Sequence, residues 1–465
     1  MYRWLIGGLL VFALLSVSVQ AAEAVGPIRT LIDVRTTHSD GAHDMDTLVG
    51  MAKARGIQAM AFTDHGRKGI RFGIEPVPNI LGYTKDYRSL YTTGLASFFA
   101  DLKRMRQAHP EMVLFAGTES IAGYEWTGIP FRNLTLHHAE RMFITLGEER
   151  PAQIESLPSY TLKHARGDLP LSVVFWTLLV FAVTVFLFRR RKRGVALLLI
   201  VSFIAFLATL LLRPAVDANA DFIKAAHQQG LFTIWAYPGT HSGVRSGPMG
   251  VQLDTPPYSR RVFTDPTADA FAAVYGDTDS NTVPGGLWDG YLADYMIGIH
   301  AHPIWAVSAG DFHKQGQAKE YLGNFPMDVW AAKRSPAAIL AAMRAGHTVN
   351  WGLRRDRNLH VTELYLGDMQ GKHLLPGDEA RVTSQVTLHV GIDEMRKRET
   401  PHRTRPLMTE IIMDGKVATR LQLRPGMPQQ EVLQLAPGPH VIRLRIPAQG
   451  GVRMVANPFL VQVAG

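Results

Sequence analysis

The chain has 465 residues, 46% of them hydrophobic, and a formal net charge of +9. This length allows two or three domains, each with its own core. The chain contains no cysteine, which excludes disulfide bonds, thiolate metal ligands and a cysteine nucleophile. Any metal site must therefore be built from His, Asp and Glu side chains.

Residues 1–24 have the pattern of a signal peptide or an uncleaved signal anchor. An early Arg precedes an apolar run that reaches about Leu15, and Ala21 and Ala24 lie in Ala-x-Ala-like sites. Both interpretations predict that the segment that follows is exported.

Two apolar runs, residues 171–188 and 195–212, are each long enough to span a bilayer and carry no charged residue. The sequence RRRKR at 189–193 lies between them and supplies much of the basic excess. We expect a two-helix transmembrane hairpin over residues 167–214, with the bilayer as a partner. By the positive-inside rule its turn is cytoplasmic, which predicts a membrane-anchored protein whose other parts lie on the outer (periplasmic or extracellular) side.

Short apolar strands alternate with helical patterns over residues 28–166 and again over residues 215–355. The segments MDTLVGMAKARG (45–56) and AMAFTDH (59–65) are examples. This alternation is typical of an α/β domain with parallel strands. Because the alternation of strands and helices resumes after the hairpin, we expect one α/β domain in two parts, with the hairpin as an insertion.

The last segment, residues 356–465, has a different pattern of hydrophobic residues. Apolar and polar residues alternate with a period of two, and Gly and Pro separate the runs. This pattern predicts an antiparallel β-sandwich. Few ionisable residues cluster there, so we expect a module for packing or recognition.

Acidic residues and histidines follow the predicted strands at the points where they end. FTDHG contains Asp64 and His65, FAGTES contains Glu119, and SAGDFH contains Asp311 and His313. One such ending also fits an ordinary loop, but α/β hydrolases carry their site residues at the carboxyl ends of strands. Imidazole and carboxylate groups bind Zn, Mn or Fe, and an open metal site activates water for hydrolysis.

The order and spacing of these motifs, with SDG at 39–41 ahead of them, resemble the PHP (polymerase and histidinol phosphatase) superfamily. The resemblance covers roughly residues 28–355 without the hairpin. It implies a distorted (β/α)7 barrel with a metal site that hydrolyses phosphoesters. The predicted fold class is thus α/β, a PHP-type barrel interrupted by a two-helix transmembrane hairpin, with a C-terminal all-β sandwich.

The same resemblance implies the roles of individual residues. His65, Glu119, Asp311 and His313 match metal ligands, and His137 or His138 falls where the family places another, of which we take His138. Glu125 is a rival to Glu119, which we prefer because it directly follows a strand. His300 and His302 precede a strand and fit loop residues better.

The chain departs from the family pattern at two places. Asp33-Val34-Arg35 replaces His-x-His, and Ala236-Tyr237-Pro238 replaces Ala-His-Pro. Asp33 remains a possible ligand, whereas Arg35 offers no lone pair and would instead hold a phosphate or carboxylate. We expect Arg35 and Asp64 to act in catalysis. The candidates to replace the missing imidazoles are His38, His43 and His241.

These observations predict an exported, membrane-anchored, metal-dependent hydrolase that holds one or two divalent ions (Zn, Mn or Fe). Its substrate would be a phosphorylated or ester compound, either a small molecule or an envelope component, and not nucleic acid. The alternative is a degenerate barrel that serves as a non-catalytic binding or scaffold protein. The substitutions at 33, 35 and 237 motivate that alternative, and the retained acidic and imidazole residues argue against it.

Overall fold

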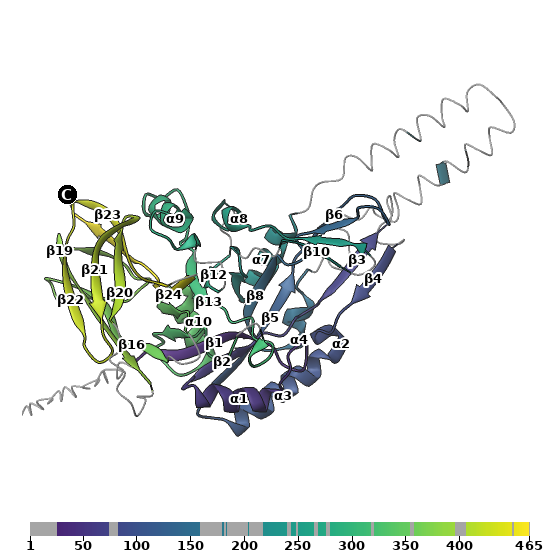
Figure 1. The fold of residues 1–465 in the computed structure, drawn as a ribbon, viewed down its shortest axis with the longest axis horizontal. Coiled ribbons are helices and arrows are strands. Elements are labelled where there is room, and N and C mark those ends of the chain that lie inside the picture. Colours follow the sequence, from purple (N-terminus) through teal and green to yellow (C-terminus); the bar gives the residue numbers. More distant parts are fainter. Residues whose placement is uncertain are drawn as a thin grey trace, which may run out of the picture.

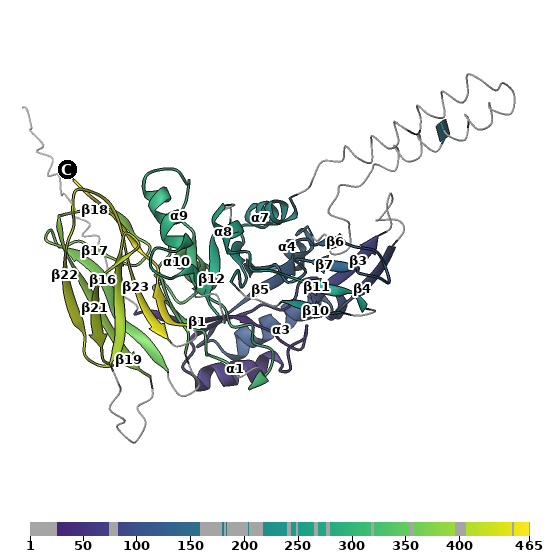
Figure 2. The ribbon, with the colours of Figure 1, turned by 45° about the horizontal axis from the view of Figure 1, so that its top comes forward.

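The computed structural model shows an α/β part that is joined at one end to a β-sandwich (Figures 1 and 2). The residues that it describes are 26–73, 82–158, 179–180, 183, 203, 217–239, 243–247, 250–264, 268–275, 280–317, 320–353, 358–395, 406–448 and 451–464.

A curled sheet of seven strands forms the centre of the α/β part, in the order β13-β12-β9-β8-β5-β2-β1. Its strands are β1 (Ile28–Val34), β2 (Ala59–Phe62), β5 (Val113–Ile121), β8 (Met142–Glu148), β9 (Phe232–Trp235), β12 (Ala270–Val274) and β13 (Trp305–Ser308). Neighbouring strands are parallel except at β8, which is antiparallel to both β5 and β9. Phe312, just after β13, forms a parallel bridge with Val34, so the sheet closes on itself near the carboxyl end of β1.

The central strands are apolar on both faces because both faces are covered. On β1, Ile28 and Ile32 pack into one core cluster, whereas Leu31 and Val34 pack into another, under helices α1 and α3. The helices are α1 (Met45–Ala54), α2 (Leu90–Thr93), α3 (Leu95–Ala108), α4 (Pro151–Glu155), α7 (Ala218–Gln228), α8 (Ser259–Thr264), α9 (Leu287–Met296) and α10 (Pro336–Arg344).

Helix α1 illustrates how the local sequence produces these elements. Asp44 caps its start, and its carboxylate accepts a hydrogen bond from the backbone N–H of Thr47 at 2.9 Å. The buried side chains Met45, Leu48, Val49 and Ala52 recur at helical spacing and face the sheet. The helix thereby fixes the chain between the ends of β1 and β2.

The large sheet continues beyond β1 into the C-terminal part. The added strands are β14 (Met327–Val329), β15 (Thr348–Trp351), β24 (Gly451–Ala456), β23 (Gly438–Ala448), β20 (Leu407–Met413) and β21 (Lys416–Leu423), with β18 (Glu379–Val382) and β25 (Phe459–Val463) on a branch. A second sheet of β17 (His373–Leu374), β16 (Leu359–Asp368), β19 (Gln385–Glu394) and β22 (Gln429–Gln434) packs against it. A core of apolar side chains fills the space between the two sheets. We keep the predicted start of the sandwich, residue 356, as a proposal.

Two small sheets lie beside the α/β part (Figure 2). One pairs β3 (Gly69–Gly73) with β4 (Gly82–Asp86), and the other has the order β10-β11-β7-β6. The strands of the second are β6 (Glu125–Thr127), β7 (Thr135–His137), β10 (Val244–Ser246) and β11 (Gln252–Asp254).

The predicted fold class is wrong in one part, the transmembrane hairpin at residues 167–214. In the part of the chain that the structure describes, no helix combines the length and apolar character that crossing a bilayer requires. Most of this segment, apart from Leu179, Val180, Val183 and Phe203, lies outside the described residues. The prediction rested on the number of consecutive apolar side chains. A segment that crosses a bilayer must also form a continuous helix in which every backbone N–H and C=O group is hydrogen-bonded. We therefore describe the fold as mixed α/β with a large share of strands, and we withdraw the hairpin and the membrane anchor.

The predicted signal segment, residues 1–24, also lies outside the described residues. The structure gives it no support, and the location of the protein stays an untested prediction.

Candidate metal centre

Asp40, His65 and His313 come together where strands β1, β2 and β13 end. One ligand atom from each lies within 4.8 Å of the other two. Asp40 follows β1 in the SDG turn, His65 follows β2, and His313 follows β13. A carboxylate with two imidazoles is a donor set for Zn, Mn or Fe.

His65 is buried and is held between two carboxylates. Its Nδ1 lies 3.2 Å from Oε2 of Glu119, and its Nε2 lies 3.2 Å from Oδ2 of Asp40. Burial lowers the pKa of His65 to about 3, although the contact with Asp40 acts in the opposite direction. The ring is therefore neutral at ordinary pH. Because a neutral imidazole carries one proton, only one of these two contacts can be a hydrogen bond donated by His65.

His313 completes the set from the other side of Asp40. Its Nδ1 lies 2.7 Å from the backbone carbonyl of Asp311, so Nδ1 carries a proton and donates it. Its Nε2 lies 3.4 Å from Oδ1 of Asp40. Burial alone would lower the pKa of His313, but the contacts with Asp40 and Asp311 outweigh it and raise the pKa to about 9.

Lys68 supplies a positive charge at this centre. Its Nζ lies 2.8 Å from Oδ2 of Asp40 and 2.8 Å from Nε2 of His65. Burial acts to raise the pKa of the Asp40 carboxyl, yet the surrounding His313, His65 and Lys68 hold it well below its usual range. Asp40 is therefore an anion, and it attracts a cation.

Arg35 lies deeper, with its side chain fully buried. Its Nη1 donates to Oδ1 of Asp33 at 2.8 Å and also to the backbone carbonyl of Thr63. Its Nη2 lies 2.6 Å from Oε2 of Glu119 and 3.3 Å from Oδ1 of Asp311. The guanidinium thus contacts three carboxylates of the protein, and the catalytic role that we expected for Arg35 stays a prediction.

The backbone around Arg35 adopts an unusual conformation. Asp33, Tyr237 and Asp311 have φ values of 67°, 50° and 42°, in the left-handed region that most residues avoid. The Tyr237 hydroxyl and the backbone N–H of Asp311 both donate to Oδ2 of Asp33. Backbone conformations of this kind concentrate at functional sites, where surrounding contacts hold them in place.

Asp64 does not face the three-residue cluster. Its buried carboxylate accepts hydrogen bonds from the backbone N–H and the hydroxyl of Thr36, both at 2.8 Å, and from the hydroxyl of Ser39. Burial raises the pKa of Asp64, and these donors act against the rise. These contacts position the loop that carries Asp40, and the catalytic role that we expected for Asp64 stays a prediction.

The predicted replacement histidines have other surroundings. His38 contacts Asp101 on α3 through Nε2 at 3.0 Å, and the His43 ring stacks on Phe312 with centroids 6.3 Å apart. His241 lies outside the described residues.

His138, the predicted fifth ligand, follows β7 and lies beside the four-stranded small sheet. Its Nδ1 lies 2.9 Å from Nη2 of Arg141, and burial lowers its pKa to about 4. Its neighbour His137 contacts Asp254 at 3.2 Å. Neither belongs to the cluster of Asp40, His65 and His313.

The sequence analysis used the SDG turn as part of the family resemblance but did not predict its aspartate, Asp40, as a ligand. The signal was present, because Asp40 is the acidic residue of that turn and follows a buried strand. Tyr275 and Glu320 were also missed. The Tyr275 hydroxyl lies 2.8 Å from Oε1 of Glu320 and 3.4 Å from Oδ2 of Asp311, and its single proton can be donated to only one of them.

The residues present fit a divalent metal ion. Glu119 is fully buried, and among the described residues its Oε1 has no hydrogen-bond partner. Its other oxygen, Oε2, lies 2.6 Å from Nη2 of Arg35 and 3.2 Å from Nδ1 of His65, a position in which second carboxylates orient metal-bound histidines. With Nδ1 protonated, the lone pair on Nε2 and the anionic Asp40 face the same cation, which is the Lys68 ammonium in this structure and could be a metal ion in its place.

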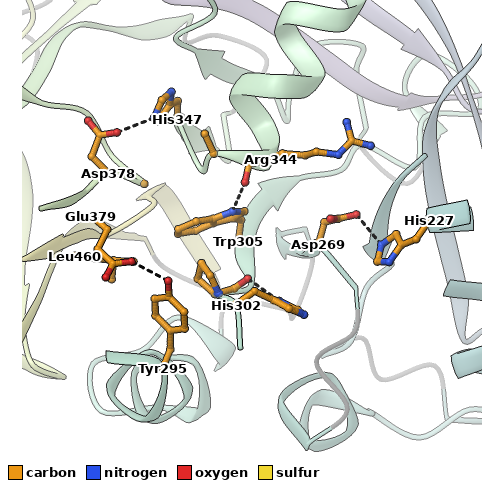
Figure 3. A pocket seen from close by; sticks show the side chains of 13 residues that line it. His227, Asp269, Tyr295, His302, Trp305, Arg344, His347, Asp378, Glu379 and Leu460 are labelled. Atoms are coloured by element: carbon orange, nitrogen blue, oxygen red, sulfur yellow. Dashed lines mark hydrogen bonds and ion pairs between the residues drawn. The ribbon is translucent and has the colours of Figure 1, made fainter. Parts of the chain in front are cut away.

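A cavity of about 650 Å³ lies elsewhere, where the α/β part meets the sandwich (Figure 3). Trp305, the first residue of β13, lines it, so the cavity lies at the opposite end of this strand from Asp311. Two of its three histidines are paired with acids, His227 with Asp269 at 3.1 Å and His347 with Asp378 at 3.0 Å, whereas Nδ1 of His302 lies 3.3 Å from the backbone carbonyl of Pro303 (Figure 3). None of the predicted site residues lines this cavity.

Comparison with solved structures finds PHP-like metal-dependent phosphoesterases and an amidohydrolase as structural neighbours. A two-domain protein from Bacteroides vulgatus, which contains a predicted PHP-like metal-dependent phosphoesterase, is 11% identical, with 93% of this chain and 94% of that chain covered and a TM-score of 0.36. A candidate metal-dependent phosphoesterase from Bifidobacterium adolescentis is 13% identical, with 63% and 90% covered and a TM-score of 0.29. An amidohydrolase from Chromobacterium violaceum, with bound sulfate and no metal, is 14% identical, with 62% and 88% covered and a TM-score of 0.28.

No family model matches the chain, and no curated protein matches it. The identities and TM-scores of the structural neighbours are low, so the function proposed below rests on the site itself.

Proposed function

We propose that this protein is a metal-dependent hydrolase of phosphoesters, with Asp40, His65 and His313 as the ligands of one divalent ion. The observation that carries the proposal is the cluster itself, whose three ligand atoms lie within 4.8 Å of one another at strand ends. A divalent ion held there supplies Lewis-acid chemistry for the hydrolysis of an ester.

The residues of the chain prepare the site for this ion. Burial keeps His65 neutral, and Glu119 holds its Nδ1 so that Nε2 points toward Asp40. The carbonyl of Asp311 holds Nδ1 of His313 in the same way. Both rings are therefore oriented before an ion arrives, which reduces the entropy lost on binding.

Positive side chains beside the centre suit an anionic substrate. Lys68 contacts Asp40 and His65, and its side chain is 28% exposed. The Arg67 guanidinium lies over the Tyr91 ring, 3.9 Å from its centroid. The Lys68 ammonium at the edge of the site favours a phosphoryl group over a neutral ester.

A non-catalytic binding or scaffold role is the second candidate. It is favoured by the position of Lys68, whose ammonium satisfies Asp40 and His65 without any ion. In that case the centre would be a structural ion pair.

Metal content and hydrolysis distinguish the two roles. We expect the purified chain, after incubation with Mn, Zn or Fe salts, to bind about one ion and to hydrolyse bis(p-nitrophenyl) phosphate or p-nitrophenyl phosphate. Asp40→Asn removes an anionic ligand and should lower both metal content and activity at least about tenfold. His138→Ala, a histidine outside the cluster, is the matched control and should retain both.

Elemental mass spectrometry and a colorimetric assay provide the measurements. Wild-type protein without bound metal or hydrolytic activity would favour the scaffold role. Equal metal loss in both variants would show that the ion does not depend on the cluster.

A further inference from the structure

The surroundings of Arg35 are those of a cation site. Three carboxylates, from Asp33, Glu119 and Asp311, converge on one guanidinium at distances of 2.6 to 3.3 Å. The side chains of Asp33 and Glu119 are at most 1% exposed to solvent. Buried carboxylates repel one another and lose hydration, so such a group requires positive charge at its centre.

The guanidinium neutralises only part of this group. Three carboxylates and one guanidinium leave two formal negative charges, unless a carboxyl binds a proton. Among the described residues Oε1 of Glu119 has no hydrogen-bond partner. The group therefore remains able to attract a cation, and Arg35 occupies its centre.

We propose that Arg35 is a built-in cation that takes the place of a second metal ion beside the Asp40–His65–His313 centre. Its guanidinium has no lone pair and cannot ligate a metal. It contacts one oxygen of each of the three carboxylates, and its positive charge opposes the binding of a metal ion among them. The protein thus holds one exchangeable ion and one fixed positive charge. This inference rests on the proposed function for the first ion.

Glu119 connects the two positive charges. Its Oε2 contacts Nη2 of Arg35 at 2.6 Å and Nδ1 of His65 at 3.2 Å. While Arg35 holds it, this oxygen orients a ligand from behind and does not bridge two ions. The role differs from the direct ligation that the family resemblance implied for Glu119.

Removing the guanidinium tests the proposal. In Arg35→Ala the three carboxylates lose their cation, and we expect them to bind one additional Mn²⁺ per chain. Arg29→Ala is the matched control, because Arg29 lies on β1, the strand that Arg35 directly follows, is also buried and pairs with a single carboxylate, Asp328, at 3.2 Å. The control should bind the same number of ions as the wild type.

Elemental mass spectrometry counts the ions, and electron paramagnetic resonance reports whether two Mn²⁺ ions are coupled. We expect an uncoupled spectrum for the wild type and Arg29→Ala, and a coupled spectrum for Arg35→Ala. An unchanged ion count in Arg35→Ala at saturating Mn²⁺ would overturn the proposal, and so would a coupled pair in the wild type.

The wild type alone decides the question if Arg35→Ala does not fold. Anomalous diffraction from Mn²⁺-soaked wild-type crystals should show a peak among Asp40, His65 and His313, and none among Asp33, Glu119 and Asp311. A peak among the latter three refutes the role of Arg35. The two proposals fail separately, because the ion count of the wild type tests the first centre, whereas the difference between Arg35→Ala and the wild type tests Arg35.

Discussion

Asp64 and His65 are adjacent in the sequence but have different surroundings. The His65 ring points toward Asp40 and Glu119, whereas the Asp64 carboxylate turns to the loop after β1 and accepts hydrogen bonds from Thr36 and Ser39. This loop carries Asp40. The position of one candidate ligand therefore depends on a residue that does not contact the site.

We predict that Asp64→Ala lowers the affinity for Mn²⁺ about 10- to 100-fold, because residues that position ligands have effects of this size. Asp44→Ala is the control. It removes the cap of α1, which follows the same loop, and should reduce stability while leaving the affinity unchanged. Titration calorimetry of both variants measures the affinity. Equal affinity in Asp64→Ala and the wild type would contradict the positioning role.

Single residues were predictable only in part. Strand-end motifs pointed to His65, Glu119, Asp311 and His313, and the structure brings these four into one connected group. Whether they act on a metal remains a prediction. His138 has the right residue type but follows β7, a strand of a small sheet. In that sheet β7 pairs with β11, which is distant in the sequence, and no local sequence pattern predicts this pairing.

At the scale of elements, the turn between β20 and β21 contacts a histidine whose protonation changes with pH, His440. Asp414 and Gly415 form its two-residue turn, with φ values of 51° and 75°, as Asp-Gly turns between paired strands require. His440 on β23 donates toward this turn, with Nδ1 2.7 Å from Oδ2 of Asp414. Its Nε2 lies 2.8 Å from the carbonyl of Ala436, so both ring nitrogens face acceptors.

This arrangement predicts a pH dependence of stability. Burial acts to lower the pKa of His440, but the carboxylate of Asp414 and the carbonyl of Ala436 raise it above 6.5. The protonated form is thus favoured in the folded state. The stabilisation is fully present below pH 6.5 and is lost as the pH rises through the raised pKa.

Denaturant unfolding at pH values on both sides of 6.5 measures this effect. The wild type should lose unfolding free energy as the pH rises through this window, and His440→Gln should lose less. Asp414→Asn removes the carboxylate and should flatten the dependence in the same way. A slope that is identical in all three proteins would show that His440 does not titrate differently on folding.

Element types were easier to predict than membrane topology. The alternation of strands and helices and the period-two pattern after residue 356 follow from which faces are buried, and such patterns are local. The apolar runs at 171–188 and 195–212 satisfied the same kind of local rule, yet the predicted hairpin was wrong. Composition reports the hydrophobicity of a segment and does not report whether a continuous helix forms.

At the scale of the whole molecule, a buried ion pair connects the α/β part to the sandwich. Arg443 on β23 contacts Asp289 on α9 through Nε at 2.6 Å and through Nη2 at 2.7 Å. The guanidinium also lies 5.1 Å from the centroid of the Trp288 ring, and it is fully buried. Helix α9 lies between the two parts in Figure 1.

We predict that Arg443→Met destabilises the protein by about 3–5 kcal/mol, because it leaves the Asp289 carboxylate buried without its partner. The double variant Asp289→Asn/Arg443→Met should recover part of this loss, since no uncompensated charge remains. Denaturant unfolding of the single and double variants measures the coupling energy. Strictly additive effects would show that the pair does not join the two parts.

The sheet that runs from the α/β part into the sandwich also limits how the chain can be divided. Val349, Asn350 and Trp351 of β15 pair with β24, which lies a hundred residues further along the chain. A chain cut after β15 would leave these backbone groups as an open strand edge, a template for aggregation. The sandwich therefore covers that edge, and a fragment made of the α/β part alone would need a replacement strand in place of β24.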